Sequence, residues 1–280
     1  MKKAGLLSLF VIFMVLAGVT QHYYDAAINY TEEKNVFVTL PSSESLKILS
    51  FGFQNLTADM LFIWAIQFYS AYHYTNRFDY IENVFNLITD LHPEYLEPYL
   101  VGSWIMALEA KDIRMAVRLL EKGSRNIPEE WVFDHEIAFY AYKELKDFDM
   151  AEKYFKRASE KPGAPSYLKR RWAHMIYLKD DLVSAYNLWV EIANSAKTRM
   201  EQDAAKNHLY QIKMEMDKKL VKERSQLFKN KYNRFPTNLE ELRAYGFIKE
   251  IPTDFKGKPY SYDPETGKIS ARKSFKWKKF

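Results

Sequence analysis

The fold of this chain is decided by three similar stretches of sequence, DIRMAVRLL at residues 112–120, DFDMAEKYF at 147–155 and DLVSAYNLW at 181–189, with a related stretch, FDYIENVF, at 78–85. Each carries a small or aliphatic residue and, four residues later, an aromatic residue or leucine. These pairs are Ile81 and Phe85, Ala116 and Leu120, Ala151 and Phe155, and Ala185 and Trp189. A proline closes each of the first three units, at Pro93, Pro128 and Pro162. The repeat of 34 or 35 residues predicts a series of helix pairs.

The repeated residues have a simple physical basis. A small side chain lets two helices approach closely, an aromatic ring one turn later fills the space beside it, and proline ends the second helix because it has no backbone N–H. The pattern resembles the tetratricopeptide repeat (TPR), a 34-residue helix–turn–helix unit, over residues 58–196. This resemblance implies an all-α fold, a TPR-like α-solenoid of about four repeats at 58–198, in which stacked units share one core.

The C-terminal part has a different pattern. Helical spacing of apolar residues predicts one long helix at 200–232, and turn residues predict a short helix capped by Thr237 or Asn238 and a hairpin that turns at 263–267. The stretch resembles the C-terminal region of the major pseudopilin of type II secretion systems, through Phe235, Pro236, Leu239, Leu242, Pro252, Asp254, Gly257, Pro259, Tyr260 and Tyr262. The resemblance implies that 199–270 is a long helix with a small α+β cap, and that the cap stacks on the last repeat.

The N-terminus predicts export. Lys2 and Lys3 precede sixteen uncharged and largely apolar residues, 4–19. Such a segment places its basic end in the cytoplasm and sends the rest of the chain across the membrane. Residues 1–24 are therefore expected to be a single-pass signal anchor in a bacterial inner membrane, with a lead-in segment at 25–57 and a periplasmic body. The alternative is a signal peptide cleaved near Ala17, which would release a secreted protein.

Composition and charge exclude several classes of function. Hydrophobic residues make up 48% of the chain, which excludes a disordered protein, and the absence of cysteine excludes disulfides and thiolate metal sites. The net charge of +5 arises in the tail at 271–280, so no basic face for nucleic acid is expected. Basic and aromatic residues alternate in that tail, which predicts contact with an anionic membrane surface through Lys276, Trp277, Lys278 and Lys279, or else a solvated terminus.

The sequence carries no recognisable catalytic motif. It has no phosphate-binding glycine loop, no serine-nucleophile motif and no zinc-protease motif. The six histidines are not at ligand spacing, and Asp134, His135 and Glu136 are adjacent in a predicted helix, so they point in different directions. We therefore expect no enzyme activity, no cofactor and no metal site.

The candidate site is implied by the TPR resemblance. In TPR arrays the first helix of each repeat lines a concave groove at its second, fifth, ninth and twelfth positions. This implies a groove lined by Ile105, Leu108, Phe133, Glu136, Tyr140, Lys143, Tyr167, Arg170, His174 and Tyr177. An apolar and aromatic lining suits an apolar helix or an extended peptide of a partner protein. The alternative occupant is the chain's own segment at 36–53.

These observations lead to one functional hypothesis with two rivals. The sequence predicts an exported scaffold that binds a partner protein in the bacterial envelope, and the pseudopilin resemblance makes a secretion or pilus-type machine the first class of partner to consider. The first rival is a structural subunit that self-associates into a homo-oligomer, filament or envelope complex. The second is an enzyme with an unfamiliar site.

Overall fold

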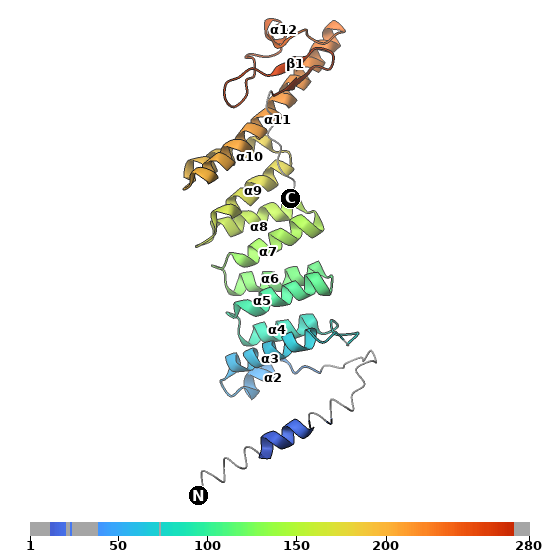
Figure 1. Ribbon diagram of the computed structural model, residues 1–280, viewed down its shortest axis with the longest axis vertical. Helices are drawn as coiled ribbons and strands as arrows, with labels where there is room; N and C mark the ends of the chain where they lie inside the picture. The colour runs from blue at the N-terminus through green and yellow to red at the C-terminus, as the bar shows by residue number, and fades with distance from the viewer. Residues whose placement is uncertain (1–11, 21–22, 24–38, 73, 272–280) are drawn as a thin grey trace. The chain divides into compact units, whose positions relative to one another are not determined.

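The computed structural model describes residues 12–20, 23, 39–72 and 74–271. The fold is mostly helical, as expected for an all-α protein (Figure 1). The chain divides into two compact units, residues 1–126 and residues 127–280. The boundary falls just before Pro128, one of the prolines predicted to end a helix.

The described helices of the first unit pack mainly against their neighbours in sequence. They are α2 (Ser43–Leu49), α3 (Gln54–Tyr69), α4 (Ile81–Leu91), α5 (Leu96–Trp104), the π-helical turn η1 (Ile105–Glu109) that continues α5, and α6 (Ile113–Asn126). Contacts join α3 to α4, α4 to α5 and α5 to α6, while α2 also rests on α4 (Figure 1).

The second unit begins with the same kind of packing and ends differently. Its elements are α7 (Val132–Tyr140), the π-helical turn η2 (Ala141–Leu145), α8 (Phe148–Glu160), α9 (Ser166–Leu178), α10 (Leu182–Ser195), α11 (Arg199–Tyr232), α12 (Leu239–Ala244), β1 (Ser261–Asp263) and β2 (Lys268–Ser270). Each helix from α7 to α11 packs on the next. The strands form an antiparallel hairpin in which Tyr262 pairs with Ile269.

The helices α6, α8 and α10 each start on a capping aspartate, whereas α4 has no side-chain cap. Backbone N–H groups in the first turn donate to Asp112 (2.8 Å), Asp147 (2.9 Å) and Asp181 (3.1 Å). A side-chain oxygen at this position satisfies a backbone donor that has no partner within the helix. The residues before these aspartates, Lys111, Lys146 and Asp180, have positive φ angles of 61°, 55° and 67°, which turn the chain sharply between the two helices.

The small and aromatic residues of the four similar stretches are all buried. The first residue of each pair is fully buried: Ile81, Ala116, Ala151 and Ala185. The second residue of each pair exposes at most 2% of its surface: Phe85, Leu120, Phe155 and Trp189. The helices α4, α6 and α8 each end two residues before a proline. Local chemistry therefore sets both ends of α6 and α8 and the C-terminal end of α4, and the buried residues join these helices to the core.

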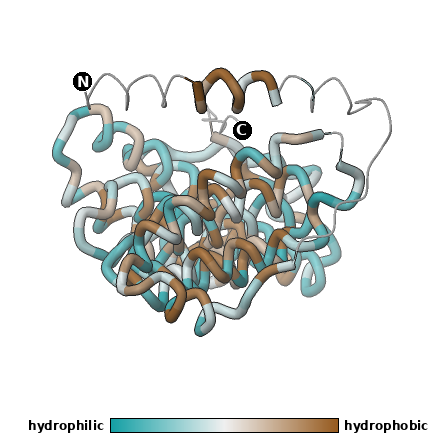
Figure 2. Tube along the Cα trace, turned by 90° about the horizontal axis from the view of Figure 1, so that it is seen from below, coloured by the Kyte–Doolittle hydropathy of each residue, from teal (hydrophilic) through white to brown (hydrophobic). Residues whose placement is uncertain are grey.

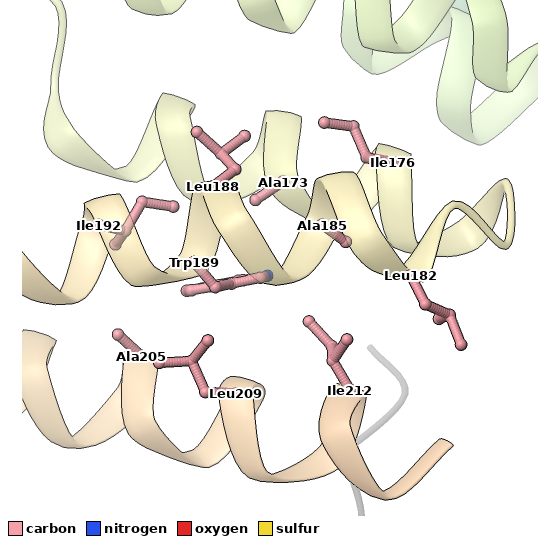
Figure 3. Packing of buried hydrophobic residues seen from close by; sticks show 10 residues of the cluster. All are labelled: Ala173, Ile176, Leu182, Ala185, Leu188, Trp189, Ile192, Ala205, Leu209 and Ile212. Carbon is pink, nitrogen blue, oxygen red and sulfur yellow. The ribbon is translucent and has the colours of Figure 1, made fainter. Parts of the chain in front are cut away.

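The long helix α11 belongs to two hydrophobic cores. Its first half packs on α10, where Trp189 lies against Ala205 and Leu209 (Figure 3). Its second half, including Val221 and Phe228, packs on α12 and the hairpin. The expectation that the α+β cap stacks on the last repeat is therefore corrected. The first half of α11 covers α10, because its apolar residues continue the core of that pair, and the cap packs on the second half of α11.

Most of the predicted export segment lies outside the described residues. Residues 12–20 are helical, and they have the colour of apolar residues in Figure 2, between grey stretches beside the N-terminus. In the part of the chain that the structure describes, no helix is both long enough and apolar enough to cross a membrane. Lys276, Trp277, Lys278 and Lys279 also lie outside the described residues.

Candidate protein-binding surface

In the first unit, the two predicted groove residues lie in the η1 turn. Leu108 is 61% exposed and Ile105 is half-buried. Trp104, the last residue of α5, is exposed as well. The first unit therefore exposes one of its two predicted residues, Leu108, together with Trp104, which was not predicted.

In α7, two predicted groove residues prove to be core residues. Phe133 is fully buried and Tyr140 is 3% exposed, so neither presents its side chain to a partner. The other two, Glu136 and Lys143, are half-buried. Glu136 lies 3.2 Å from Nδ1 of the neighbouring His135, and the Lys143 ammonium lies 5.3 Å from the ring centre of Tyr142.

On α7 the residues of the exposed face lie one position before the residues that were predicted to form it. Phe139, next to the buried Tyr140, is 41% exposed, and His135 and Tyr142 share its face because they lie four residues before and three after it. The His135 ring centre is 5.8 Å from that of Tyr167, and the Tyr142 ring centre is 6.4 Å from that of His174. The face that meets the predicted residues of α9 therefore consists of His135, Phe139 and Tyr142.

The cause of this shift is the π-helical turn. The buried small residues of the first helices, Ser103, Ala138 and Ala173, lie thirteen, thirteen and twelve residues before Ala116, Ala151 and Ala185. The two pairs with the longer spacing contain η1 and η2, whereas α9 ends without a π-helical turn. Counting positions back from the second helix therefore misplaces α5 and α7 by one residue and places α9 correctly.

On α9 all four predicted residues lie on one partly exposed face. Tyr167, Arg170, His174 and Tyr177 are each half-buried. The centres of the His174 and Tyr177 rings are 6.2 Å apart. Together with α7 they form a surface that we call the α7–α9 aromatic face, made of His135, Phe139, Tyr142, Tyr167, His174 and Tyr177.

The helix α11 borders this face and contacts two of the predicted residues. Arg170, one of the predicted groove residues, already pairs with Glu201 of α11 at 3.3 Å. Gln211 donates a hydrogen bond to the Tyr177 hydroxyl at 3.1 Å. Burial raises the pKa of Tyr177, which keeps its hydroxyl protonated at neutral pH. The charge of Arg170 is therefore already paired within the chain.

Two histidines at the edge of the face are neutral at physiological pH. Burial lowers the pKa of His174 to about 4 and that of His208, on α11, to about 3, with a smaller effect from positive charge nearby. His208 stacks on Trp189, with ring centres 3.8 Å apart. Both histidines are therefore uncharged at pH 7, and their rings pack against neighbouring aromatic rings.

A buried carboxylate in α7 ties that helix to the end of α8. Asp134 is fully buried, and its two oxygens lie 2.9 Å from Arg157 and 2.9 Å from Lys161. Lys161 also donates to the backbone carbonyl of Glu130 at 2.9 Å. Because each oxygen of the Asp134 carboxylate is paired with a cationic side chain, these three residues form a structural ion pair network rather than a site for a ligand. Within the described ranges, no three His, Asp or Glu side chains are grouped as metal ligands.

Sequence reasoning missed His135, Phe139, Tyr142 and Trp104. The signal that could have found them is the spacing of 35 between Ser103, Ala138 and Ala173, which marks equivalent positions in the first helices. Comparison with known proteins adds no further guide, because no protein-family model and no curated protein matches this chain.

Proposed function

We propose that this protein is an exported, membrane-anchored scaffold of TPR-like helix pairs that binds a partner protein in the bacterial envelope. The observation that carries the proposal is the α7–α9 aromatic face. Its side chains come from two adjacent helices, and Phe139 keeps 41% of its surface exposed although it is large and apolar. Aromatic residues of this kind supply much of the binding energy in protein interfaces.

The chemistry of the face favours an uncharged partner segment. Arg170 is already paired with Glu201, so the surface offers aromatic rings and hydroxyl groups rather than a free cation. Such a surface suits an apolar helix or an extended peptide whose side chains pack between the rings. A component of a secretion or pilus-type machine is the first partner class to test, by the resemblance of the C-terminal part to a pseudopilin.

The proposal is tested by purifying the full chain from its native membranes in mild detergent and identifying bound proteins by mass spectrometry. We expect Phe139→Glu to reduce recovery of the partner by about tenfold or more, because losing an interface anchor costs about 2 kcal/mol or more. Val183→Glu is the matched control, since Val183 on α10 is also apolar and is 58% exposed. Both variants should keep the thermal stability of the parent, because both side chains are already exposed.

Two results would contradict this proposal. If Phe139→Glu and Val183→Glu recover the same amount of partner as the parent, the α7–α9 aromatic face is not the binding site. If the chain is recovered only with copies of itself, as an assembly of several chains, the protein is a self-associating structural subunit instead.

A further inference from the structure

The start of the first unit exposes an unusual number of large apolar side chains. On α2 and the turn after it, Ile48 is 76% exposed and Phe51 is 84% exposed, and Leu49 and Phe53 are exposed as well. On α3 the exposed apolar residues Leu56, Met60 and Ile63 continue from Phe53 at steps of three, four and three residues, which places them along one side of the helix. We call these seven residues the α2–α3 apolar face.

The helix α3 is apolar on both of its sides. One side, including Ala58, Phe62 and Ala65, is buried and packs on α4. The opposite side carries the exposed stripe, and Asp59 is the only charged residue in the helix. A helix that is apolar all round is normally buried on all sides. A continuous row of exposed large apolar side chains is typical of an interaction site.

The turn between α2 and α3 is built to hold its apolar side chains outward. Thr57 donates to the Ser50 hydroxyl at 3.0 Å, and Phe53 N–H donates to the Ser50 carbonyl at 2.8 Å. Phe51 has a φ of 49°, a conformation that bulky residues rarely adopt. Its ring makes little contact with the rest of the described chain, so internal packing does not compensate for this backbone conformation.

We propose that the α2–α3 apolar face inserts into the interfacial layer of a lipid bilayer, with Phe51 and Ile48 at its deepest point. The inference rests on the membrane attachment included in the proposed function. It adds a second contact, which would hold the first helix pair against the surface of the membrane.

Charge and shape favour lipid over protein as the occupant. From Ser43 to Tyr72 the chain carries only three charged residues, Glu44, Lys47 and Asp59, so the face suits a neutral lipid interface. Phe51 projects from a tight turn and Ile48 from the end of the helix before it, and a fluid bilayer closes around such a protruding tip more completely than a preformed protein surface does. Aromatic and aliphatic side chains of this kind are typical of interfacial contacts.

The connection to the N-terminal segment keeps this face close to the membrane. Residues 12–20 form an apolar helix with exposed side chains on all sides. Only fifteen residues separate Tyr23 from Thr39, so the connection reaches about 55 Å at most, whatever its path. A tether of this length raises the effective concentration of the bilayer at the face, as linkage does for any second binding event.

The absence of cysteine makes a site-specific test possible. Single cysteines are introduced in the full chain as Phe51→Cys and Ile63→Cys, with Leu108→Cys as the matched control, because Leu108 is an exposed leucine of the same unit. Each variant is labelled with an environment-sensitive fluorophore and reconstituted into phosphatidylcholine vesicles. We expect doxyl groups carried by the lipids to quench labels at 51 and 63 severalfold more than the label at 108, and aqueous iodide to show the reverse order.

The other outcomes separate this inference from the proposed function. If the chain does not float with the vesicles, membrane attachment itself fails, and both proposals fail on that point. If it floats but iodide quenches all three labels equally, the face lies in water and this inference alone is overturned. If labels at 51 and 63 are shielded from both quenchers, a protein covers the face, which also overturns lipid insertion.

Discussion

At Gly102 the backbone of α5 lies against side chains of both neighbouring helices. A Cβ atom at this position would lie 2.6 Å from Cδ1 of Phe85 on α4 and 2.7 Å from Cδ2 of Leu119 on α6. Both side chains are buried, so neither can move far without disturbing the core. The small residues of the second helices could be predicted from their spacing, but Gly102 could not, because a lone glycine does not show what lies opposite it.

We expect Gly102→Ala to lower the free energy of unfolding by about 1–3 kcal/mol, even though alanine favours a helix, because overpacking forces the neighbours apart. Urea denaturation of the full chain measures the change. Combining it with Leu119→Ala is the control, since the shortened side chain makes room for the new methyl group. The double variant should lose less stability than the two single changes added together. Equal stability of Gly102→Ala and the parent would refute the close approach.

The π-helical turns explain at the level of elements why the predicted face of α7 was wrong. The one-residue difference between the pairs is visible in the sequence, but the sequence does not show whether a loop or a helix absorbs it. In this structure the extra residue lies in the π-helical turns η1 and η2, at the end of the first helix of each pair. As a result, the outward-facing positions of α5 and α7 differ by one residue from those obtained by counting back from the second helix. A single extra residue inside an α-helix commonly forms such a turn.

A deletion tests this account. Removing Glu144, an exposed residue of η2, should convert the π-helical turn into ordinary α-helix and change the free energy of unfolding by less than about 1 kcal/mol. Removing the exposed Arg171 from α9 should cost more than about 3 kcal/mol, because each deleted residue rotates the two parts of an α-helix by about 100°. Urea denaturation compares the two. Equal losses would mean that η2 does not hold the extra residue.

At the scale of the whole molecule, acid is expected to destabilise the protein in two stages. The pKa of His174 is about 4 and that of His208 about 3 in the folded chain, against 6.5 for an unperturbed histidine. At pH values between 6.5 and the folded-state pKa, these histidines bind more protons in the unfolded chain than in the folded chain. The free energy of unfolding therefore falls as the pH falls through this range. Hydrogen bonds from Arg234 and Thr237 lower the pKa of Glu241 to about 2, so its contribution is lost only below about pH 4.5.

We therefore expect the free energy of unfolding to drop by roughly 2–4 kcal/mol between pH 7 and pH 5, before the carboxylates contribute. Chemical denaturation at several pH values measures this slope. In a variant with His174→Gln and His208→Gln the slope in this interval should largely disappear, whatever the stability of the variant at pH 7. An unchanged slope would show that other groups cause the acid sensitivity.

The sequence alone determined the local features of this protein. Asp112, Asp147 and Asp181 cap the starts of α6, α8 and α10, and α4, α6 and α8 end before prolines, because capping oxygens and missing N–H groups act within one turn of the chain. The buried positions could be predicted from their spacing, as could the change of pattern after the long helix.

Only the tertiary structure decided which surfaces remain available. The exposure of Phe139 instead of Tyr140 depends on how the backbone absorbs one extra residue. The pairing of Arg170 with Glu201 depends on α11 folding back beside α9, and the exposed stripe of α3 depends on α4 covering only one side of an apolar helix. Each of these depends on backbone geometry or on packing between elements, which residue spacing by itself does not specify.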